Sequence, residues 1–356
     1  MLTVLNVAYP LAHVGWDAVG GAEQVVAALD AALVGAGHRS LVVACEGSQV
    51  AGHLVAVPRV SGPFDLDAMR AAQSRHRRAI DEALQRWRCD VVHMHGLDFA
   101  AYLPAEGVPV LATLHCPPQW YSRAALLTAR PGTYLNAVSW RQHETLAPNQ
   151  RLLEPIENGV PVGAFTGRHA KRSFALMLSR IAPEKGVHVA LAAAKRAGIP
   201  LVVAGQLFPY PEHERYFSRE IAPRLDRWRR FVGPVGFARK RRLLAAARCL
   251  VVCSQVPETS SLVAREALAA GTPVVALQHG ALVDTVEHGR TGFLAGDEQG
   301  LADAMLRAGE IDSEHCRQVA RRRFDAADMA RRYLRAYEHL VERHSQRRAV
   351  LKAGAA

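Results

Sequence analysis

Short apolar runs rich in β-branched residues alternate with alanine-rich stretches along most of this chain. Strands that are apolar along their whole length, with helices between them, are typical of a parallel sheet covered on both faces. The sequence therefore predicts an α/β fold. In the first half the expected strands are "LTVLNVAYP", "SLVVAC", "CDVVHMHG" and "VPVLATLHC", and the expected helices are residues 21–37 and 65–87.

The same alternation begins again after the segment "EPIENGVPVGAF". Because 356 residues exceed what one hydrophobic core usually supports, we expect two domains, residues 1–160 and 161–335, followed by a basic helix or tail over 336–356. In such paired sheets ligands bind at the carboxyl ends of the strands, so the expected site is the cleft between the domains. The second-half strands expected are "SFALMLSR", "PLVVAGQ", "RRFVGPV", "CLVVCS", "TPVVAL" and "TGFLAG", with helices at 186–197 and 239–247 and one or two amphipathic helices over 313–351.

A formal net charge of +11 implies attraction to anions, which include nucleic acid, anionic membranes and phosphorylated small molecules. The basic residues lack interleaved aromatic residues, which argues against a nucleic-acid partner. The six cysteines show no zinc-site spacing, and the apolar start lacks the basic residues of a signal peptide. We therefore expect a cytoplasmic protein with at most peripheral contact at the inner face of an anionic membrane; the oligomeric state stays open.

The stretch "PETSSLVAREALAAGTPVV" carries two glutamates, Glu258 and Glu266. A helix is expected to begin near Ser260, which places Glu266 inside it and Glu258 just before it. Eight helical steps would separate them by roughly 12 Å, too far for carboxylates that act as a pair. The free amides of Ser260, Ser261 and Leu262 can hold a phosphate. The pattern indicates a ligand with hydroxyl groups on both sides of a phosphate, such as a nucleotide sugar.

The stretch "LSRIAPEKGVHVAL" places Arg180 at a strand end and Lys185 at the start of a helix. Two cations at such a junction suit a diphosphate, Arg as a fork and Lys as a point charge. The alternative is a pair of surface cations at a turn. Because no carboxylate-rich metal motif accompanies them, the sequence predicts metal-independent chemistry and no metal site.

Together these motifs resemble the retaining glycosyltransferases of the GT-B fold, glycosyltransferase family 4. The resemblance implies two Rossmann-like domains whose parallel sheets face each other across a cleft. It also implies transfer of a hexosyl-type group from a nucleoside-diphosphate sugar, with UDP or GDP favoured, to an unidentified acceptor hydroxyl without a cofactor. By the same resemblance Glu266 holds the ribose, Glu258 and the amides after it face the donor sugar, and Arg180 and Lys185 neutralise the departing diphosphate.

The resemblance extends to other stretches of the chain. The loop "GGAE" matches a family loop that approaches the donor phosphates, which assigns Gly20 and Gly21 to it. His115, at the end of "VLATLH", matches a family histidine that positions donor and acceptor. Gly233 and Val235, in "VGPVGF", match the segment that cradles the base.

The chain also departs from the family pattern. Serines stand in "ETSSLV" where the family has Phe-Gly-Leu or Gly-Gly, and Cys116 follows the histidine in place of aspartate. A nucleotide-sugar-binding protein without catalytic activity, or an epimerase or phosphorylase of the same fold, therefore remains an alternative. His95 is read either as a structural histidine or as a site residue.

The remaining charged stretches receive plainer interpretations. The cations of 239–242 are read as a solvated helix surface. The basic stretches "RHRR" near Arg75 and "RRRF" at 321–324 are candidates for contact with an anionic membrane or acceptor.

Overall fold

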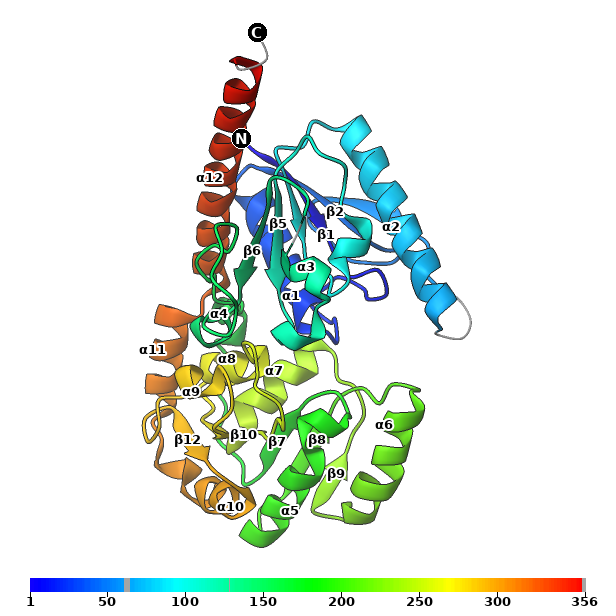
Figure 1. The fold of residues 1–356 in the computed structure, drawn as a ribbon. Coiled ribbons are helices and arrows are strands. Elements are labelled where there is room, and N and C mark those ends of the chain that lie inside the picture. The colour runs from blue at the N-terminus through cyan, green and yellow to red at the C-terminus, as the bar shows by residue number, and fades with distance from the viewer. Residues whose placement is uncertain (61–64, 128, 354–356) are drawn as a thin grey trace. The chain divides into compact units, whose positions relative to one another are not determined.

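The structure, a computed structural model, describes residues 1–60, 65–127 and 129–353. The contacts divide the chain into two compact units. The first comprises Met1–Asn158 and the C-terminal segment from Ala326, and the second comprises Gly159–Asp325. Each contains a six-stranded sheet in which neighbouring strands run parallel. Figure 1 labels several strands of each sheet. The predicted α/β class is confirmed.

The sheet of the first unit has the order β3-β2-β1-β4-β5-β6. Its strands are apolar and almost wholly buried in the centre, as expected for a sheet covered on both faces. The strands are β1 (Thr3–Val7), β2 (Arg39–Cys45), β3 (His53–Val57), β4 (Val91–Met94), β5 (Val110–Leu114) and β6 (Thr133–Ala137), and the helices are α1 (Gly21–Gly35), α2 (Leu66–Arg86), α3 (Arg123–Leu127), α4 (Trp140–His143) and α12 (Ala326–Ala353).

The sheet of the second unit has the order β12-β11-β10-β7-β8-β9. Its strands are β7 (Ala175–Leu178), β8 (Leu201–Ala204), β9 (Arg229–Phe231), β10 (Cys249–Val252), β11 (Val274–Leu277) and β12 (Gly292–Ala295). Its helices are α5 (Val187–Ala197), α6 (Pro211–Tyr216), α7 (Phe237–Ala246), α8 (Leu262–Ala269), α9 (Leu282–Thr285), α10 (Glu298–Arg307) and α11 (Ser313–Arg323).

Two strands were absent from the predicted set, β3 and β6, and both lie at the edges of the first sheet. β3 is only partly buried, so its sequence lacks the continuous apolar character of a central strand. β6, "TYLNA", is interrupted by the polar residues that it buries. Edge position and buried polar residues therefore explain why the periodicity missed them.

The C-terminal helix α12 belongs to the first unit, beside α1 and β4, and Figure 1 draws it along that unit in orange and red. Tyr333, Tyr337 and Leu340 on one face of this helix are completely buried. The predicted division instead ended the second domain at residue 335 and treated 336–356 as a separate tail. The difference arises because the apolar face of a long helix has to be covered, and here the core of the first unit covers it.

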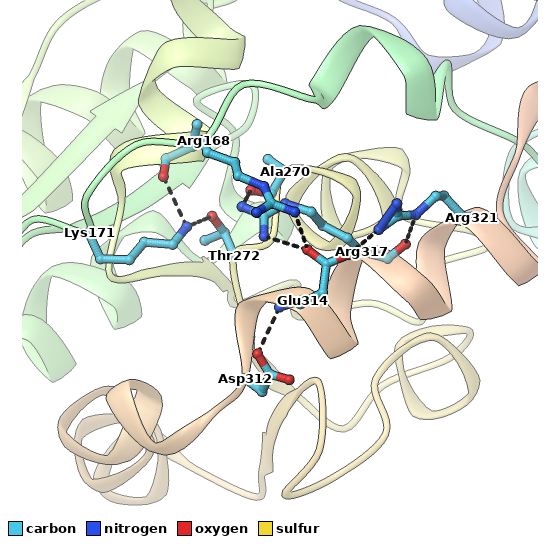
Figure 2. A network of polar contacts seen from close by, with 9 residues as sticks. Arg168, Lys171, Ala270, Thr272, Asp312, Glu314, Arg317 and Arg321 are labelled. Carbon is cyan, nitrogen blue, oxygen red and sulfur yellow. Dashed lines mark hydrogen bonds and ion pairs between the residues drawn. The ribbon is translucent and has the colours of Figure 1, made fainter.

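An ionic network holds the start of α11 in the second unit (Figure 2). The carboxylate of Glu314 accepts hydrogen bonds from Arg168, 3.2 Å away, from Arg317, 3.3 Å away, and from Arg321. Arg317 also donates to the carbonyl oxygen of Ala270, 3.3 Å away, at the end of α8. Part of the basic surface of α11 is therefore balanced within the protein.

Candidate functional site

A glycine turn brings Lys185 to the carboxyl edge of the second sheet. Gly186 adopts a left-handed conformation with φ 64°, and a Cβ at this position would clash with the carbonyl oxygen of Cys253, just after β10. Glycine therefore permits the close approach of the two loops. As a result the Nζ atom of Lys185 lies 2.7 Å from Oε1 of Glu258. Two predicted site residues that are far apart in sequence thus form one ion pair.

Glu258 is the partly buried, ionised partner in this pair. Its side chain is 14% exposed, and it also accepts from the hydroxyl of Ser254. Burial acts to raise the pKa of Glu258, but the charge and hydrogen bond of Lys185, with Ser254 and Arg180, bring it below its ordinary value. Arg180 itself lies 3.3 Å from Glu184 and is about one third exposed. The cations predicted to meet a diphosphate therefore lie around this carboxylate.

The helix α8 begins at Leu262, two positions later than the predicted start near Ser260. The reason is the conformation of Ser261, which is left-handed with φ 58° and is the one described non-glycine residue with positive φ. The hydroxyls of Ser260 and Ser261 are buried and have no hydrogen-bond partner among the described residues. Buried polar groups are nearly always paired, so two unpaired hydroxyls at a helix start mark this place for a polar ligand.

Glu266, as predicted, lies within α8, and it is 2% exposed. Its Oε1 atom accepts from Nζ of Lys240 at 2.6 Å, whereas its Oε2 atom has no hydrogen-bond partner among the described residues. Burial raises the pKa of Glu266 and outweighs the opposing effect of Lys240. The two glutamates are therefore independent, each with its own lysine.

Lys240 corrects the interpretation of 239–242 as a solvated helix surface. It is 9% exposed and lies on α7, while its neighbours Arg239 and Arg241 are exposed. Its spacing of four residues from the buried Leu244 puts both on one face of the helix. That spacing was the signal in the sequence that sets Lys240 apart from the other cations.

The predicted base-contacting residues follow β9, at the same carboxyl edge of the sheet. Gly233 is left-handed with φ 69°, and its carbonyl accepts from the amide of Gly205 at 2.9 Å. Val235 is partly buried against the core of the second unit. Apart from Glu266, which lies within α8, the second-unit residues assigned from the sequence thus follow strands or lie at helix starts.

In the first unit, Gly20 precedes α1, which begins at Gly21. A Cβ on Gly20 would clash with the carboxylate of Glu23, which is 5% exposed. Glycine at this position therefore makes room for a buried carboxylate beside the helix start. The expected loop and helix are present, with Gly20, which has no side chain, at the N-cap position.

His95 and His115 follow the neighbouring strands β4 and β5 and form a hydrogen-bonded pair. The Nδ1 atom of His95 lies 3.0 Å from Nε2 of His115, and the rings are stacked with centroids 5.3 Å apart. Burial lowers the pKa of His115 to about 4. Burial, together with His93 and His115, lowers the pKa of His95 well below its ordinary range. Both imidazoles are therefore neutral near pH 7.

The described residues contain no group of three or more His, Cys, Asp or Glu side chains arranged to hold a metal ion. None of the six cysteines, all of which the structure describes, is in a disulfide bond. Within the part of the chain that the structure describes, no helix is both long and apolar enough to cross a membrane.

Comparison with protein families gives two matches that together cover most of both units. Residues 19–162 match the model "Glycosyltransferase Family 4", and residues 172–310 match "Glycosyl transferases group 1". The chain belongs to the group 1 glycosyltransferases. The expected family is thereby confirmed.

Glycogen synthase of Mycobacterium tuberculosis is 30% identical over 254 residues, which cover 62% of this chain. The chain spans about 60% of the length of that relative. Phosphatidyl-myo-inositol mannosyltransferase of Mycobacterium leprae is 28% identical over 349 residues, which cover 83% of this chain and 90% of the relative.

Solved structures establish the fold of this glycosyltransferase. AviGT4, a glycosyltransferase involved in avilamycin A biosynthesis, superposes with a TM-score of 0.73 at 24% identity, over 96% of this chain and 98% of its own. HepE of Anabaena, solved with UDP and glucose, gives a TM-score of 0.73 at 18% identity, over 95% of this chain and 100% of its own. The chain has the GT-B fold, as expected.

Proposed function

We propose that this protein is a retaining glycosyltransferase that moves a hexosyl group from a nucleoside-diphosphate sugar to an acceptor hydroxyl. The observation that carries the proposal is the set of polar groups around the start of α8. A partly buried pair, Lys185–Glu258, and a buried pair, Lys240–Glu266, lie there, with two unpaired serine hydroxyls between the glutamates in the sequence. A family member with hydroxyl donors and an unpaired carboxylate oxygen in one segment, and with cations from other segments beside it, has the groups that a nucleotide sugar requires.

The donor is proposed to lie along the segment from Glu258 to Glu266. The unpaired Oε2 atom of Glu266 accepts from a ribose hydroxyl. The hydroxyls of Ser260 and Ser261 donate to phosphate, and the positive end of the α8 dipole favours the same anion. The loop of Gly233 and Val235 contacts the base. Each of these residues is thus matched to the part of the nucleotide sugar that its hydrogen-bonding or apolar groups can contact.

Catalysis is proposed to depend on stabilising the departing diphosphate. Arg180 and Lys185 neutralise the charge that develops there, which is the kind of interaction that contributes most to such reactions. When Lys185 turns from Glu258 to phosphate, the carboxylate becomes available for the hydroxyls of the transferred sugar. His115 is proposed to position donor and acceptor as a neutral imidazole, and the Gly20–Gly21 loop to approach the donor phosphates.

A donor panel tests the proposal. Purified protein is supplied with UDP-, GDP- and ADP-sugars, with and without candidate acceptors, and binding and nucleotide release are measured. We expect one donor class to be bound and cleaved, and Arg180→Ala/Lys185→Ala to lower turnover by about 100-fold or more, because each lost charge stabilised the transition state. The control is Lys195→Ala/Arg196→Ala, two cations in the last turn of α5.

Two results would contradict this function. If no nucleotide sugar or nucleoside diphosphate binds, the site is misassigned. If the parent and the Arg180→Ala/Lys185→Ala protein hydrolyse donor equally, the alternative of a nucleotide-sugar-binding protein without transferase activity is favoured.

Peripheral contact with an anionic membrane at the cytoplasmic face is proposed for α2. The other basic stretch is internally paired, since Arg322 and Arg323 lie 3.9 and 3.6 Å from Glu287. On α2, Arg70 and Arg78 are both exposed, and Arg70 also lies 3.5 Å from the carboxylate of Asp67. The relative from Mycobacterium leprae is named for a phosphatidyl lipid, which supports a lipid-linked acceptor.

Vesicle binding tests this contact. We expect sedimentation with phosphatidylglycerol vesicles at low salt that weakens as salt screens the charges. Arg70→Glu/Arg78→Glu should reduce it, whereas Arg219→Glu/Arg230→Glu in the second unit should not. Absence of binding at low salt would refute the proposal.

A further inference from the structure

Buried polar side chains from β4, β5, β6 and α12 form a hydrogen-bonded network in the first unit. The ring of His93 connects its two sides, with Nδ1 at 2.6 Å from the hydroxyl of Tyr337 and Nε2 at 2.7 Å from the hydroxyl of Thr113. The hydroxyl of Thr113 lies 2.7 Å from Oδ1 of Asn136 and 3.2 Å from the hydroxyl of Tyr333. All five side chains are completely buried.

Counting protons fixes the direction of these bonds. Thr113 has one hydroxyl proton, and it donates to Asn136 because an amide oxygen only accepts. Thr113 must therefore accept from Nε2 of His93. Burial lowers the pKa of His93 well below its ordinary value, so the ring is neutral and its Nδ1 accepts from Tyr337. Both nitrogens of His93 are thereby used within the network.

His95 packs directly against this ring, with the centroids 3.9 Å apart. Since both nitrogens of His93 are engaged, His93 offers no hydrogen bond to its neighbour. His95 is 2% exposed, and its Nε2 atom has no hydrogen-bond partner among the described residues. Its Nδ1 atom makes the 3.0 Å contact with Nε2 of His115.

The unpaired Nε2 atom decides which histidine donates. If His115 donated, neutral His95 would carry its one proton on Nε2 as a buried N–H group with no acceptor. Buried N–H groups without a partner are rare and costly, more so than under-used acceptors. If His95 donates from Nδ1, the unpaired atom is an acceptor and the buried donor is satisfied.

We infer that His95 is a positioning residue whose Nδ1–H group donates to Nε2 of His115, fixing the ring of His115 and placing its proton on Nδ1. This inference rests on the proposed function, in which His115 positions donor and acceptor. The packing of His95 on His93, which α12 holds through Tyr337, keeps the His95 ring in place. His95, which the sequence allows to be either a structural histidine or a site residue, thus acts on the site by orienting His115.

Two substitutions of nearly equal size separate hydrogen bonding from packing. In His95→Asn the side-chain amide lies near the former Nδ1 position and can donate, whereas in His95→Leu nothing can. We expect the turnover number of His95→Asn to stay within about threefold of the parent value. That of His95→Leu should fall about tenfold, which corresponds to the free energy of roughly one hydrogen bond. The KM for the donor should be unchanged in both variants. His76→Leu, at a buried histidine of α2 with no hydrogen bond among the described residues, is the control.

Nitrogen NMR of the imidazoles in the unsubstituted protein provides a second test that does not depend on activity. With His115 assigned by its loss in His115→Phe, we expect its proton on Nδ1. A proton on Nε2 of His115, or equal losses of turnover in His95→Asn and His95→Leu, would overturn the inference. If the donor panel fails while His115 carries its proton on Nδ1, the proposed function fails and the histidine geometry stands.

Discussion

Ser261 holds a left-handed conformation that residues with a Cβ avoid. Glycine has no Cβ and adopts this conformation without such a penalty. We predict that Ser261→Gly raises the free energy of unfolding by up to about 1 kcal/mol, because relief of the strain exceeds the entropy cost of glycine. The same change should weaken donor binding, because it removes a hydroxyl proposed to contact phosphate. Urea unfolding and titration with the donor measure the two effects.

Ser261→Ala is the matched control, since it removes the hydroxyl but keeps the backbone strain. It should weaken donor binding as Ser261→Gly does, without the gain in stability. Unchanged donor affinity in both variants would exclude the hydroxyl from the site.

The two glutamates are expected to contribute differently. Glu266→Gln should mainly weaken nucleotide affinity, and Glu258→Gln should mainly lower turnover, because Glu266 is proposed to hold the ribose and Glu258 the transferred sugar. Glutamine is the substitution because it keeps the size of each side chain, and its carbonyl oxygen can still accept a hydrogen bond from the lysine beside it. Isothermal titration and initial-rate kinetics separate the effects, and identical changes in both constants would contradict the division.

At the scale of elements, the histidines of α2 and of the segments that follow β4 and β5 make the first unit sensitive to acid. Burial, with a smaller contribution from Arg75, lowers the pKa of His76 to about 4, and burial lowers that of His115 to about 4. The unfolded chain binds protons near pH 6.5 that these folded rings do not. The free energy of unfolding should therefore be highest above pH 6.5 and fall as the pH drops toward 4.

The variant His76→Asn removes the contribution of one of these histidines to the pH dependence of unfolding. It should flatten the pH dependence of unfolding between about pH 6.5 and 4 by about 1.4 kcal/mol per pH unit, the effect of one proton. Urea unfolding monitored at several pH values provides the measurement. An unchanged slope would mean that His76 titrates normally in the folded protein.

Helix α12 shows how one element joins distant parts of the sequence. Its first turns follow the second unit in the chain, yet its tyrosines complete the polar network of β4, β5 and β6 in the first. The hydrophobic spacing of the sequence predicted an amphipathic helix correctly. It could not indicate which core would cover that helix.

At the scale of the whole molecule, the charge chemistry of the site is supplied by side chains. If Arg180 and Lys185 neutralise the diphosphate, transfer should proceed at an unchanged rate in excess EDTA. Initial rates before and after chelation, and after adding back Mg²⁺ or Mn²⁺, measure this. A loss of activity that a divalent cation restores would contradict metal-independent transfer.

The sequence by itself determined the α/β class, the two repeated sheets and the segment from Glu258 to Glu266. These follow from local periodicity and from motifs whose residues are contiguous. The edge strands β3 and β6 were not predicted because they are less buried or less apolar than the central strands.

Only the tertiary structure decided which groups meet. The pairs Lys185–Glu258 and Lys240–Glu266 join residues 73 and 26 positions apart, and His95 meets His115 across two strands. Such partners depend on chain folding and burial, which the spacing of residues along one segment does not specify. For the same reason the left-handed turn at Ser261 and the covering of α12 were visible only once the packed units were in place.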